Sequence, residues 1–370
     1  MSVRLQAWDL LRRLLFPPRD DPKIGDGSAT LDNTVVQTEM VQQANASFVT
    51  AGLWQGLRRS GLDGLIDDPV REYLDAFHAM NAERNERIRR QTLECVAALN
   101  RAGVVPMPLK GAAYLLSGLY AEPGERFLSD IDLLIPEAAA SRASAALAGI
   151  GFRAAPSRFD YTEHHHLPTL IRTLNDVAVE LHTAPVLPLA RVSLSSDEIW
   201  AGATEHESRG CRWRTASVTD TAMLSFLHGE VVDRALARCV VDLRGFQDLF
   251  RLVDRANGEI DWERNRNRAS RGGHLPTFRR YTSVFAQLTG RQFVGKWGGD
   301  RWRDRAYHSL LRSAVRWPSI QRWANDFQVL QARPLRQRYD IGESPIALRA
   351  YRIRAFGGIV RKRLRRRPGR

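Results

Sequence analysis

Apolar positions recur at helical spacing over most of the first hundred residues. Residues 3–16 combine leucines and aromatic residues with arginines, which predicts an amphipathic helix docked on the protein body rather than on a membrane surface. Residues 34–60 repeat the helical spacing. Residues 70–102 extend it over a long helix that ends at Gly103, a residue typical of a helix C-terminus. We therefore expect residues 1–102 to form a helical N-terminal region.

The pattern changes from residue 104 onward, where short aliphatic runs alternate with polar ones. Residues 126–135 end in alternating acidic and aliphatic side chains, which is the period of a β-strand. Residues 168–182 hold two aliphatic runs on either side of Asn175-Asp176, a pair that favours a turn, so this segment predicts a β-hairpin. Strands and short helices together indicate an α/β core over residues 103–200.

Helical spacing returns in the second half of the chain, most clearly over residues 219–256. We expect residues 201–348 to form a helical C-terminal domain. Because the predicted strands lie between helical segments rather than alternating with helices throughout, the predicted fold class is α+β. Asp242 and Asp248 are expected at the surface or cap of a helix, and His228, on an apolar helical face, is expected to be a core histidine.

Composition places the chain among ordinary soluble globular proteins. It has 370 residues, of which 44% are hydrophobic and 26% charged, enough for more than one packed unit. Cys95, Cys211 and Cys239 show no Cys-x-x-Cys spacing, which argues against a zinc site or a disulfide framework and fits a reducing cytoplasm. No apolar run approaches the roughly 20 residues needed to cross a bilayer. We therefore expect a cytoplasmic protein without a transmembrane segment.

The net charge of +14 is concentrated at the end of the chain. Residues 349–370 contain ten Lys and Arg and no acidic residue, which leaves +4 for everything before them. A basic tail gives weak support to a nucleic-acid partner. The alternative is a solvated, partly disordered tail with no such partner.

The predicted strand at residues 126–135 carries two acidic residues that could bind a metal ion. Asp130 and Asp132 are two residues apart, so their side chains point to the same side, roughly 6.6 Å apart along the strand. Like charges this close are unfavourable unless a cation lies between them, and Mg²⁺ prefers oxygen ligands of this kind. The alternative is a solvated strand edge that happens to carry two acids.

A second feature lies upstream, where an aliphatic stretch meets a helical run at Lys110-Gly111. A glycine at a strand-to-helix junction leaves backbone N–H groups accessible to a phosphate, with help from the helix N-terminus. Lys110 is placed to meet the charge of the same phosphate. The sequence therefore combines a candidate phosphate site with a candidate metal site.

These motifs carry a family resemblance. The segments Leu-Lys-Gly-Ala-Ala-Tyr-Leu-Leu and Glu-Arg-Phe-Leu-Ser-Asp-Ile-Asp-Leu-Leu-Ile resemble the bacterial nucleotidyltransferase family of the DNA-polymerase-β-type nucleotidyltransferase superfamily, over about residues 70–290. The chain departs from the wider superfamily in having Ala112 after the first glycine and a longer gap between Gly111 and Asp130. The resemblance implies that residues 103–200 form a small mixed β-sheet nucleotidyltransferase core flanked by helices.

The resemblance also implies roles for individual residues. The run Val-Glu-Leu-His resembles the acid-Leu-His element of the family, which makes Glu180 a third carboxylate beside Asp130 and Asp132. These three are the expected catalytic and metal-binding residues, and they would hold two Mg²⁺ ions. Residues expected to contact the nucleotide or its metal are Lys110, Gly111, Arg126, Ser129 and His182.

Some assignments stay open at this point. Arg126 could neutralise phosphate charge or pair with the aspartates. Glu180 could instead be an exposed edge-strand residue, and Asp176, in the predicted turn, is the competing third acid. The three residues His164, His165 and His166 cannot all face one ion, although one of them could reach substrate or phosphate.

The predicted function is transfer of a nucleoside monophosphate from an NTP to an acceptor hydroxyl by a two-metal mechanism. The acceptor is not predicted and could be a small molecule or a macromolecule. One alternative is a non-catalytic module that binds a nucleotide or a partner with the same fold. Another is a nucleic-acid-binding protein anchored by its basic tail. Neither the preferred base nor the oligomeric state follows from the sequence.

Overall fold

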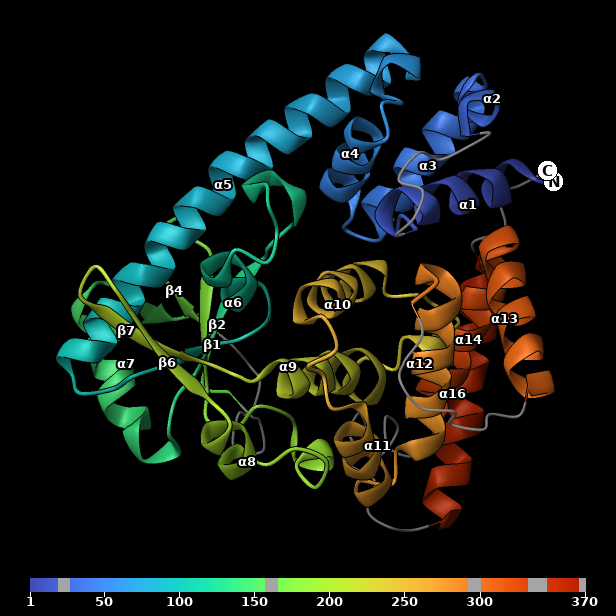
Figure 1. The fold of residues 1–370 in the computed structure, drawn as a ribbon. Coiled ribbons are helices and arrows are strands. Elements are labelled where there is room, and N and C mark those ends of the chain that lie inside the picture. The colour runs from blue at the N-terminus through green and yellow to red at the C-terminus, as the bar shows by residue number, and fades with distance from the viewer. Residues whose placement is uncertain (19–26, 157–165, 292–300, 332–344, 366–370) are drawn as a thin grey trace. The chain divides into compact units, whose positions relative to one another are not determined.

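The described structure consists of residues 1–18, 27–156, 166–291, 301–331 and 345–365 of a computed structural model. Two units are present: residues 1–233 with 242–300, and residues 234–241 with 301–370. The first unit carries two β-sheets among helices, and its mixture of elements confirms the predicted α+β class (Figure 1).

Helices make up most of the first unit. They are α1 (Val3–Leu15), α2 (Gly27–Leu31), α3 (Thr34–Ala46), α4 (Thr50–Arg59), α5 (Asp68–Arg101), α6 (Lys110–Ser117), α7 (Ala140–Gly149), α8 (Ser196–Ala201), α9 (Val218–Phe226), α10 (Leu243–Ala256), α11 (Trp262–Arg271) and α12 (Leu275–Thr289). The predicted long helix at residues 70–102 is α5, which runs along the sheet in Figure 1.

The principal sheet has five short strands in the order β1-β2-β5-β4-β3. The strands are β1 (Met107–Pro108), β2 (Asp130–Leu134), β3 (Arg153–Ala154), β4 (Leu170–Ile171) and β5 (Ala178–His182). Strands β2 and β5 pair in parallel, and the other pairs are antiparallel, so the sheet is mixed as predicted. The antiparallel β4–β5 pair confirms the predicted hairpin at residues 168–182.

One face of this sheet is packed against helices, and the other carries the polar side chains of β2 and β5. Ile131 and Leu133 of β2 are completely buried in an apolar cluster with Val179 and Leu181 of β5. Residues of α5 and α7 complete the same cluster, each fully buried aliphatic side chain contributing about 1.5–3 kcal/mol to folding. Because side chains alternate along a strand, the intervening polar residues of β2 and β5 are turned to the opposite face.

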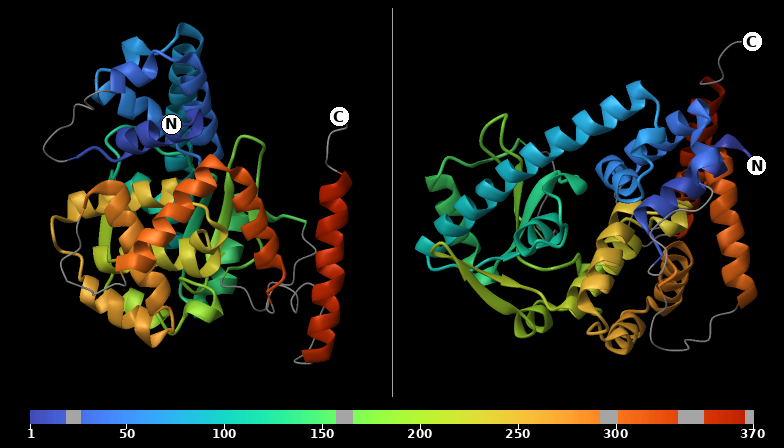
Figure 2. Two further views of the ribbon diagram at one scale, coloured as in Figure 1. Left: turned by 90° about the vertical axis from the view of Figure 1, so that its right-hand side faces the viewer. Right: turned by 45° about the horizontal axis from the view of Figure 1, so that its top comes forward.

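The N-terminal helices form their own packed group. Helix α1 packs on α3 and α4 through one apolar face, which confirms the predicted docked amphipathic helix (Figure 2). The Arg12 guanidinium donates to the Leu288 carbonyl at 3.0 Å and so ties α1 to the end of α12. No helix within the described ranges is long and apolar enough to cross a membrane.

A second, two-stranded sheet lies where only helices were expected. It consists of β6 (Thr204–Ser208) and β7 (Cys211–Thr215), joined by Arg209 and Gly210, which have φ angles of 52° and 73°. Two successive residues with positive φ are the signature of a tight hairpin turn. Trp213 and Cys211 pack against Val96 of α5, which fixes the hairpin beside the core.

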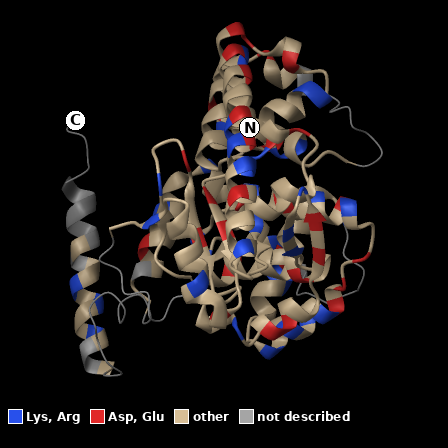
Figure 3. Cartoon of the chain, turned by 90° about the vertical axis from the view of Figure 1, so that its left-hand side faces the viewer, with Lys and Arg blue, Asp and Glu red and all other residues tan. Residues whose placement is uncertain are grey.

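The second unit is helical in its described residues. It contains α13 (Arg301–Arg316), α14 (Pro318–Val329) and α16 (Pro345–Arg365), and α14 packs on a short turn at residues 236–238. The Arg238 Nε donates to Asn325 Oδ1 at 2.5 Å across that contact. Residues 349–365 belong to α16, so this basic segment, expected as a partly disordered tail, is helical there. Figure 3 shows basic and no acidic residues along the coloured part of α16.

Candidate functional site

The register of β2 and β5 brings together acids that are far apart in the chain. In this parallel pair Asp132 lies directly opposite Glu180, and Asp130 lies opposite Ala178. One ligand atom from each of Asp132, Glu180 and His182 lies within 4.8 Å of the other two. The strand register expected for Glu180 is thereby confirmed.

The competing third acid is elsewhere. Asp176 lies near the β4–β5 turn and accepts from Arg172 Nε at 2.8 Å and from Thr173 Oγ1 at 2.9 Å. These donors, Arg172 above all, hold the pKa of Asp176 below its usual value. The Asp176 carboxylate is therefore engaged in a local ion pair with Arg172.

Asp132 is the most strongly held of the acids. It is 2% exposed, and its Oδ1 lies 2.7 Å from His182 Nε2 and 3.3 Å from Lys110 Nζ. Burial acts to raise the pKa of Asp132, but the Lys110 charge and the His182 hydrogen bond outweigh it and place the pKa well below the ordinary value. Asp132 is consequently an ionised ligand at neutral pH.

Asp130 has a different environment at the start of β2. Its Oδ1 accepts from Ser129 Oγ at 3.0 Å, which accounts for one contact of the predicted Ser129. Burial and the neighbouring Asp132 charge raise the pKa of Asp130. Asp130 is not part of the group formed by Asp132, Glu180 and His182, in which one ligand atom of each residue lies within 4.8 Å of the others.

Lys110 begins α6 directly after β1, which confirms the predicted strand-to-helix junction. Its φ is 47°, a left-handed conformation that costs a residue other than glycine of order 1 kcal/mol. The Lys110 side chain is 36% exposed and extends to Asp132. Lys110 therefore links the strand-to-helix junction, which is the predicted phosphate site, to the buried carboxylate of Asp132.

Gly111 and Arg126 form one steric unit. A Cβ on Gly111 would lie 2.5 Å from Arg126 Nη1 and 3.0 Å from Leu128 Cγ. Only a glycine here lets the arginine pass along the start of α6. The structure thus gives Gly111 a packing role that the sequence did not reveal.

Arg126 pairs with Asp248 rather than with the strand aspartates, so of its two open assignments the phosphate contact stays a prediction. Its Nε and Nη2 donate to the two carboxylate oxygens of Asp248 at 2.6 and 2.8 Å. Tyr120 also donates to Asp248 at 2.6 Å. Burial would lower the pKa of Arg126, but Asp248 raises it well above its ordinary value.

The same pair corrects the expectation for Asp248. It is 6% exposed and lies on α10 with its carboxylate fully engaged, so it is a buried ion-pair partner and not a surface acid. Asp242, in contrast, caps α10 by accepting from Gly245 N at 3.0 Å, as expected. No local pattern in the sequence indicates the Arg126–Asp248 pair, because its partners are 122 residues apart.

His166 is the one residue of the histidine triplet that the structure describes; His164 and His165 lie outside the described residues. Its Nε2 lies 3.9 Å from Glu180 Oε2, and its ring centroid is 5.3 Å from that of His182. Glu180 also accepts from Thr169 Oγ1 at 3.2 Å. His166 therefore reaches the acids from the neighbouring edge of the sheet.

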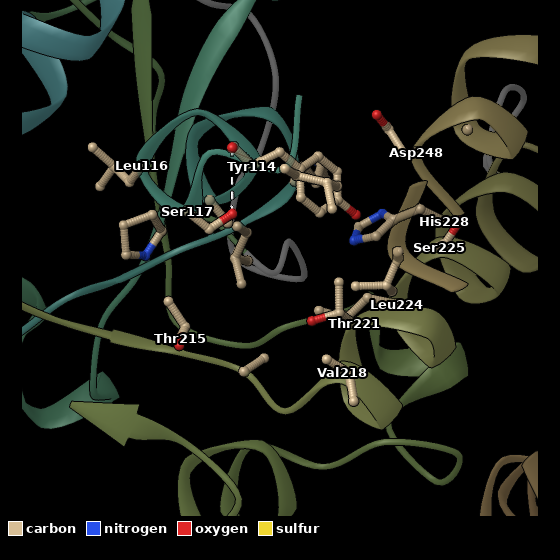
Figure 4. Close-up of a pocket in the computed structure, with 18 of the residues that line it drawn as sticks. Tyr114, Leu116, Ser117, Thr215, Val218, Thr221, Leu224, Ser225, His228 and Asp248 are labelled. Carbon is tan, nitrogen blue, oxygen red and sulfur yellow. Dashed lines mark hydrogen bonds between the residues drawn. The ribbon is translucent and has the colours of Figure 1, made fainter. Parts of the chain in front are cut away.

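A pocket of about 760 Å³ opens beside these residues. Lys110, Glu180 and His166 line it on the sheet side, together with Tyr114 and Ser117 of α6. The opposite side comes from α9, α10 and the turn between them, which gives the pocket one wall from each half of the first unit (Figure 4).

His228 lies on the helical wall of this pocket, which corrects its expected place in the core. It belongs to a π-helical turn, Leu227–Val232, and its side chain points across the pocket toward Tyr114 in Figure 4. Its charge is among the influences that lower the pKa of Asp132. π-Turns are frequent at functional sites, but nothing in the local sequence distinguishes this one from ordinary helix.

The donor set suits a divalent cation. Asp132 and Glu180 offer carboxylate oxygens and His182 an imidazole nitrogen, and Asp132 is ionised without any metal. Hard and borderline divalent ions accept this combination of ligands. His182 is fully buried against Asp132, so its predicted nucleotide contact becomes a contact with the acid cluster.

At this site adjacent strands present carboxylates beside a strand–helix junction. A protein-family model described as uncharacterised nucleotidyltransferase matches residues 34–290, and the chain belongs to that family. A comparison with curated proteins finds no match. The family assignment agrees with the resemblance drawn from the Leu-Lys-Gly and Ser-Asp-Ile-Asp segments.

Proposed function

We propose that the protein transfers a nucleoside monophosphate from an NTP to an acceptor hydroxyl, with pyrophosphate as the leaving group. One observation carries the proposal: the in-register pairing of β2 and β5 sets Asp132 opposite Glu180 at the side of a pocket. The family to which the chain belongs supports the reaction class. The bond formed joins the acceptor oxygen to the α-phosphorus, and the bond broken joins that phosphorus to the bridging oxygen of pyrophosphate.

Metal binding fits the acids of the site. Asp132 and Glu180, with His182, would hold one divalent ion, and Asp130 is proposed to contribute to a second. Bound metal would neutralise negative charge on the phosphates and lower the barrier to displacement. The positions of Asp132, Glu180 and His182 would determine where the positive charge of the metal lies.

Lys110 and the start of α6 are proposed to receive the triphosphate. The Lys110 ammonium stands at the pocket and already faces a carboxylate, so its charge is held in position. The first turn of α6 adds free backbone N–H groups, which favour a phosphate. Positioning of this kind supplies most of the rate in phosphoryl transfer.

Glu180 is proposed as the base for the acceptor hydroxyl. Its side chain is 23% exposed and lines the pocket, whereas that of Asp132 is 3% exposed and lies behind it. A general base must be within hydrogen-bond reach of the proton that it removes. The helical wall with His228 would then hold the acceptor, since it faces Glu180 across the pocket.

If the protein were a non-catalytic nucleotide- or partner-binding module, Glu180 would be expected to lie far from Asp132. Asp132 and Glu180 are instead neighbours in register, which favours catalysis over simple binding. The anchored nucleic-acid alternative rests on α16 and its basic residues alone. We therefore retain nucleotidyl transfer as the best-supported function.

The test is to incubate the full-length protein with each NTP, divalent metal and a panel of hydroxyl-bearing acceptors. Mass spectrometry should show a product heavier by one nucleoside monophosphate, with matching pyrophosphate release. Tight NTP binding without pyrophosphate release for any acceptor would support the non-catalytic module instead. The control is Asp132→Asn, which should give no product.

A further inference from the structure

We propose that the metal ion held by Asp132 and Glu180 is also bound by the imidazoles of His182 and His166, and that the site therefore selects a transition ion such as Mn²⁺ or Zn²⁺ over Mg²⁺. This inference rests on the metal-dependent function proposed above for the same site. It replaces the expected all-carboxylate set of Asp130, Asp132 and Glu180 with a mixed set of oxygen and nitrogen donors.

His182 supplies the first nitrogen. It is fully buried at the end of β5, and its Nε2 lies 2.7 Å from Asp132 Oδ1 and 3.7 Å from Glu180 Oε2. Its ring is thus fixed between the two carboxylates. A metal ion bound there would replace the proton shared by Nε2 and Asp132.

His166 is proposed to supply the second nitrogen. Its Nδ1 lies 2.8 Å from the Leu167 carbonyl, and because a carbonyl only accepts, Nδ1 carries the hydrogen. In the neutral ring Nε2 then keeps its lone pair, and Nε2 is the atom that lies 3.9 Å from Glu180 Oε2. An imidazole oriented by a backbone carbonyl through its other nitrogen is typical of metal-bound histidine.

The two rings are neighbours. Their centroids are 5.3 Å apart, and the backbones of His166 and His182 form a β-bridge. Asp130 and His166 are both outside the group of Asp132, Glu180 and His182 atoms within 4.8 Å of one another, and His166 joins the proposed set because its Nε2 lies 3.9 Å from Glu180 Oε2.

The donor chemistry decides which ion is favoured. Mg²⁺ demands oxygen ligands in octahedral geometry and keeps several waters, whereas imidazole suits Mn²⁺, Zn²⁺ and their neighbours. Affinity for mixed nitrogen and oxygen sites rises from Mn²⁺ toward Zn²⁺. Two carboxylates with two imidazoles therefore favour a transition ion over Mg²⁺.

The test uses the full-length protein, freed of metal by a chelator and then given Mn²⁺ alone, without nucleotide. The electron paramagnetic resonance signal of free Mn²⁺ measures binding, and electron spin echo modulation of bound Mn²⁺ detects directly coupled ¹⁴N. We expect ¹⁴N modulation from imidazole, displacement of Mn²⁺ by equimolar Zn²⁺, and resistance to an approximately tenfold excess of Mg²⁺. Bound Mn²⁺ without ¹⁴N modulation, or displacement by equimolar Mg²⁺, would overturn the inference.

Variants assign the nitrogens. His166→Ala and His182→Ala should each reduce the ¹⁴N modulation and weaken Mn²⁺ binding by about tenfold or more. The matched control is His206→Ala, which removes an exposed β6 imidazole that also lines the pocket but is outside the metal-binding group and is bonded to Thr215 at 2.7 Å; it should leave both measurements unchanged. Loss of signal in the control alone would contradict the assignment. If His182→Ala does not fold, the half-buried His166 and the wild-type spectrum still decide the question.

Failure of this inference is separable from failure of the proposed function. Nucleotidyl transfer with a bound ion that shows no ¹⁴N coupling would remove the histidines from the metal site and leave the reaction. Clear ¹⁴N coupling with no transfer to any acceptor would leave the metal site and remove the reaction.

Discussion

Single residues in this protein serve the site through partners that the local sequence does not show. Gly111 belongs to the predicted phosphate-binding junction, and Arg126 belongs to the segment that carries the family resemblance. In the structure the glycine makes room for the arginine, and the arginine joins the acid-bearing core to Asp248 on α10. The two motif residues therefore set the position of the helical wall of the pocket.

Gly111→Ala tests this steric unit. A methyl group there would lie 2.5 Å from Arg126 Nη1, so the guanidinium must shift or the start of α6 must move. We expect a loss of about 1–3 kcal/mol of stability, measured by denaturant unfolding. The matched control is Gly149→Ala at the end of α7, where an added Cβ meets no atom within 4 Å. Equal effects of the two substitutions would contradict the packing role of Gly111.

The two strand aspartates should respond oppositely to neutralisation in the metal-free protein. Asp132→Asn leaves Lys110 and His182 without their carboxylate and should cost about 1.5–3 kcal/mol. Asp130→Asn removes a carboxylate whose pKa is raised by burial and by the Asp132 charge, so stability should stay level or rise. Unfolding free energies measured with a chelator present compare the two.

The pH dependence of the Asp132→Asn effect follows from the direction in which folding shifts the pKa of Asp132. Because folding lowers the pKa of Asp132, its ionised form stabilises the fold above its unfolded pKa of about 3.9 and that contribution is lost as pH falls toward the folded pKa. The difference between wild type and Asp132→Asn should therefore be full near neutral pH and shrink in acid. A difference that grows below pH 4 would contradict the assignment.

At the scale of elements, the hairpin β6–β7 offers a test of local turn chemistry. Arg209 and Gly210 both have positive φ, and asparagine is favoured over arginine at the first such position. We expect Arg209→Asn to raise stability by roughly 0.5 kcal/mol and Gly210→Ala to lower it by about 1 kcal/mol. Thermal unfolding of both variants measures the difference, and the opposite order would show that the turn is not formed as described.

The sequence predicts elements well where one strand or helix carries its own pattern. Alternation in β2 correctly separates Asp130 and Asp132 from Ile131 and Leu133, and the hairpin pattern correctly places Glu180 on the acid face. The β6–β7 hairpin lies in a segment predicted to be helical, although charged residues alternate around Arg-Gly and indicate a hairpin. The turn chemistry of Arg-Gly is a weaker pattern than the helical spacing of the neighbouring segments.

Features that depend on distant packing were not accessible from the sequence. The partner of Arg126, the π-turn that carries His228 and the approach of His166 to Glu180 all require the folded arrangement of separate segments. Each joins residues through tertiary contacts that leave no periodic signal in the chain. Residue types could be nominated in advance, but their partners could not.

At the scale of the molecule, the proposed chemistry lies entirely within the first unit. All residues around the pocket belong to residues 1–233 or 242–300, and the basic residues of α16 belong to the second unit. The charge that dominates the composition therefore belongs to a different unit from the acids that would carry the reaction. Overall net charge, the strongest feature of the composition, is thus a poor guide to this site.

The most direct measurement is pyrophosphate release by wild type, Glu180→Gln and Asp176→Asn, under the NTP, metal and acceptor conditions that give the wild-type product. Glu180 lines the pocket beside Asp132, whereas Asp176 is paired with Arg172 near the turn. We expect Glu180→Gln to slow release by about 10²–10⁴-fold and Asp176→Asn to remain near the wild-type rate. A folded Glu180→Gln protein that releases pyrophosphate at the wild-type rate would contradict the proposed nucleotidyl transfer mechanism.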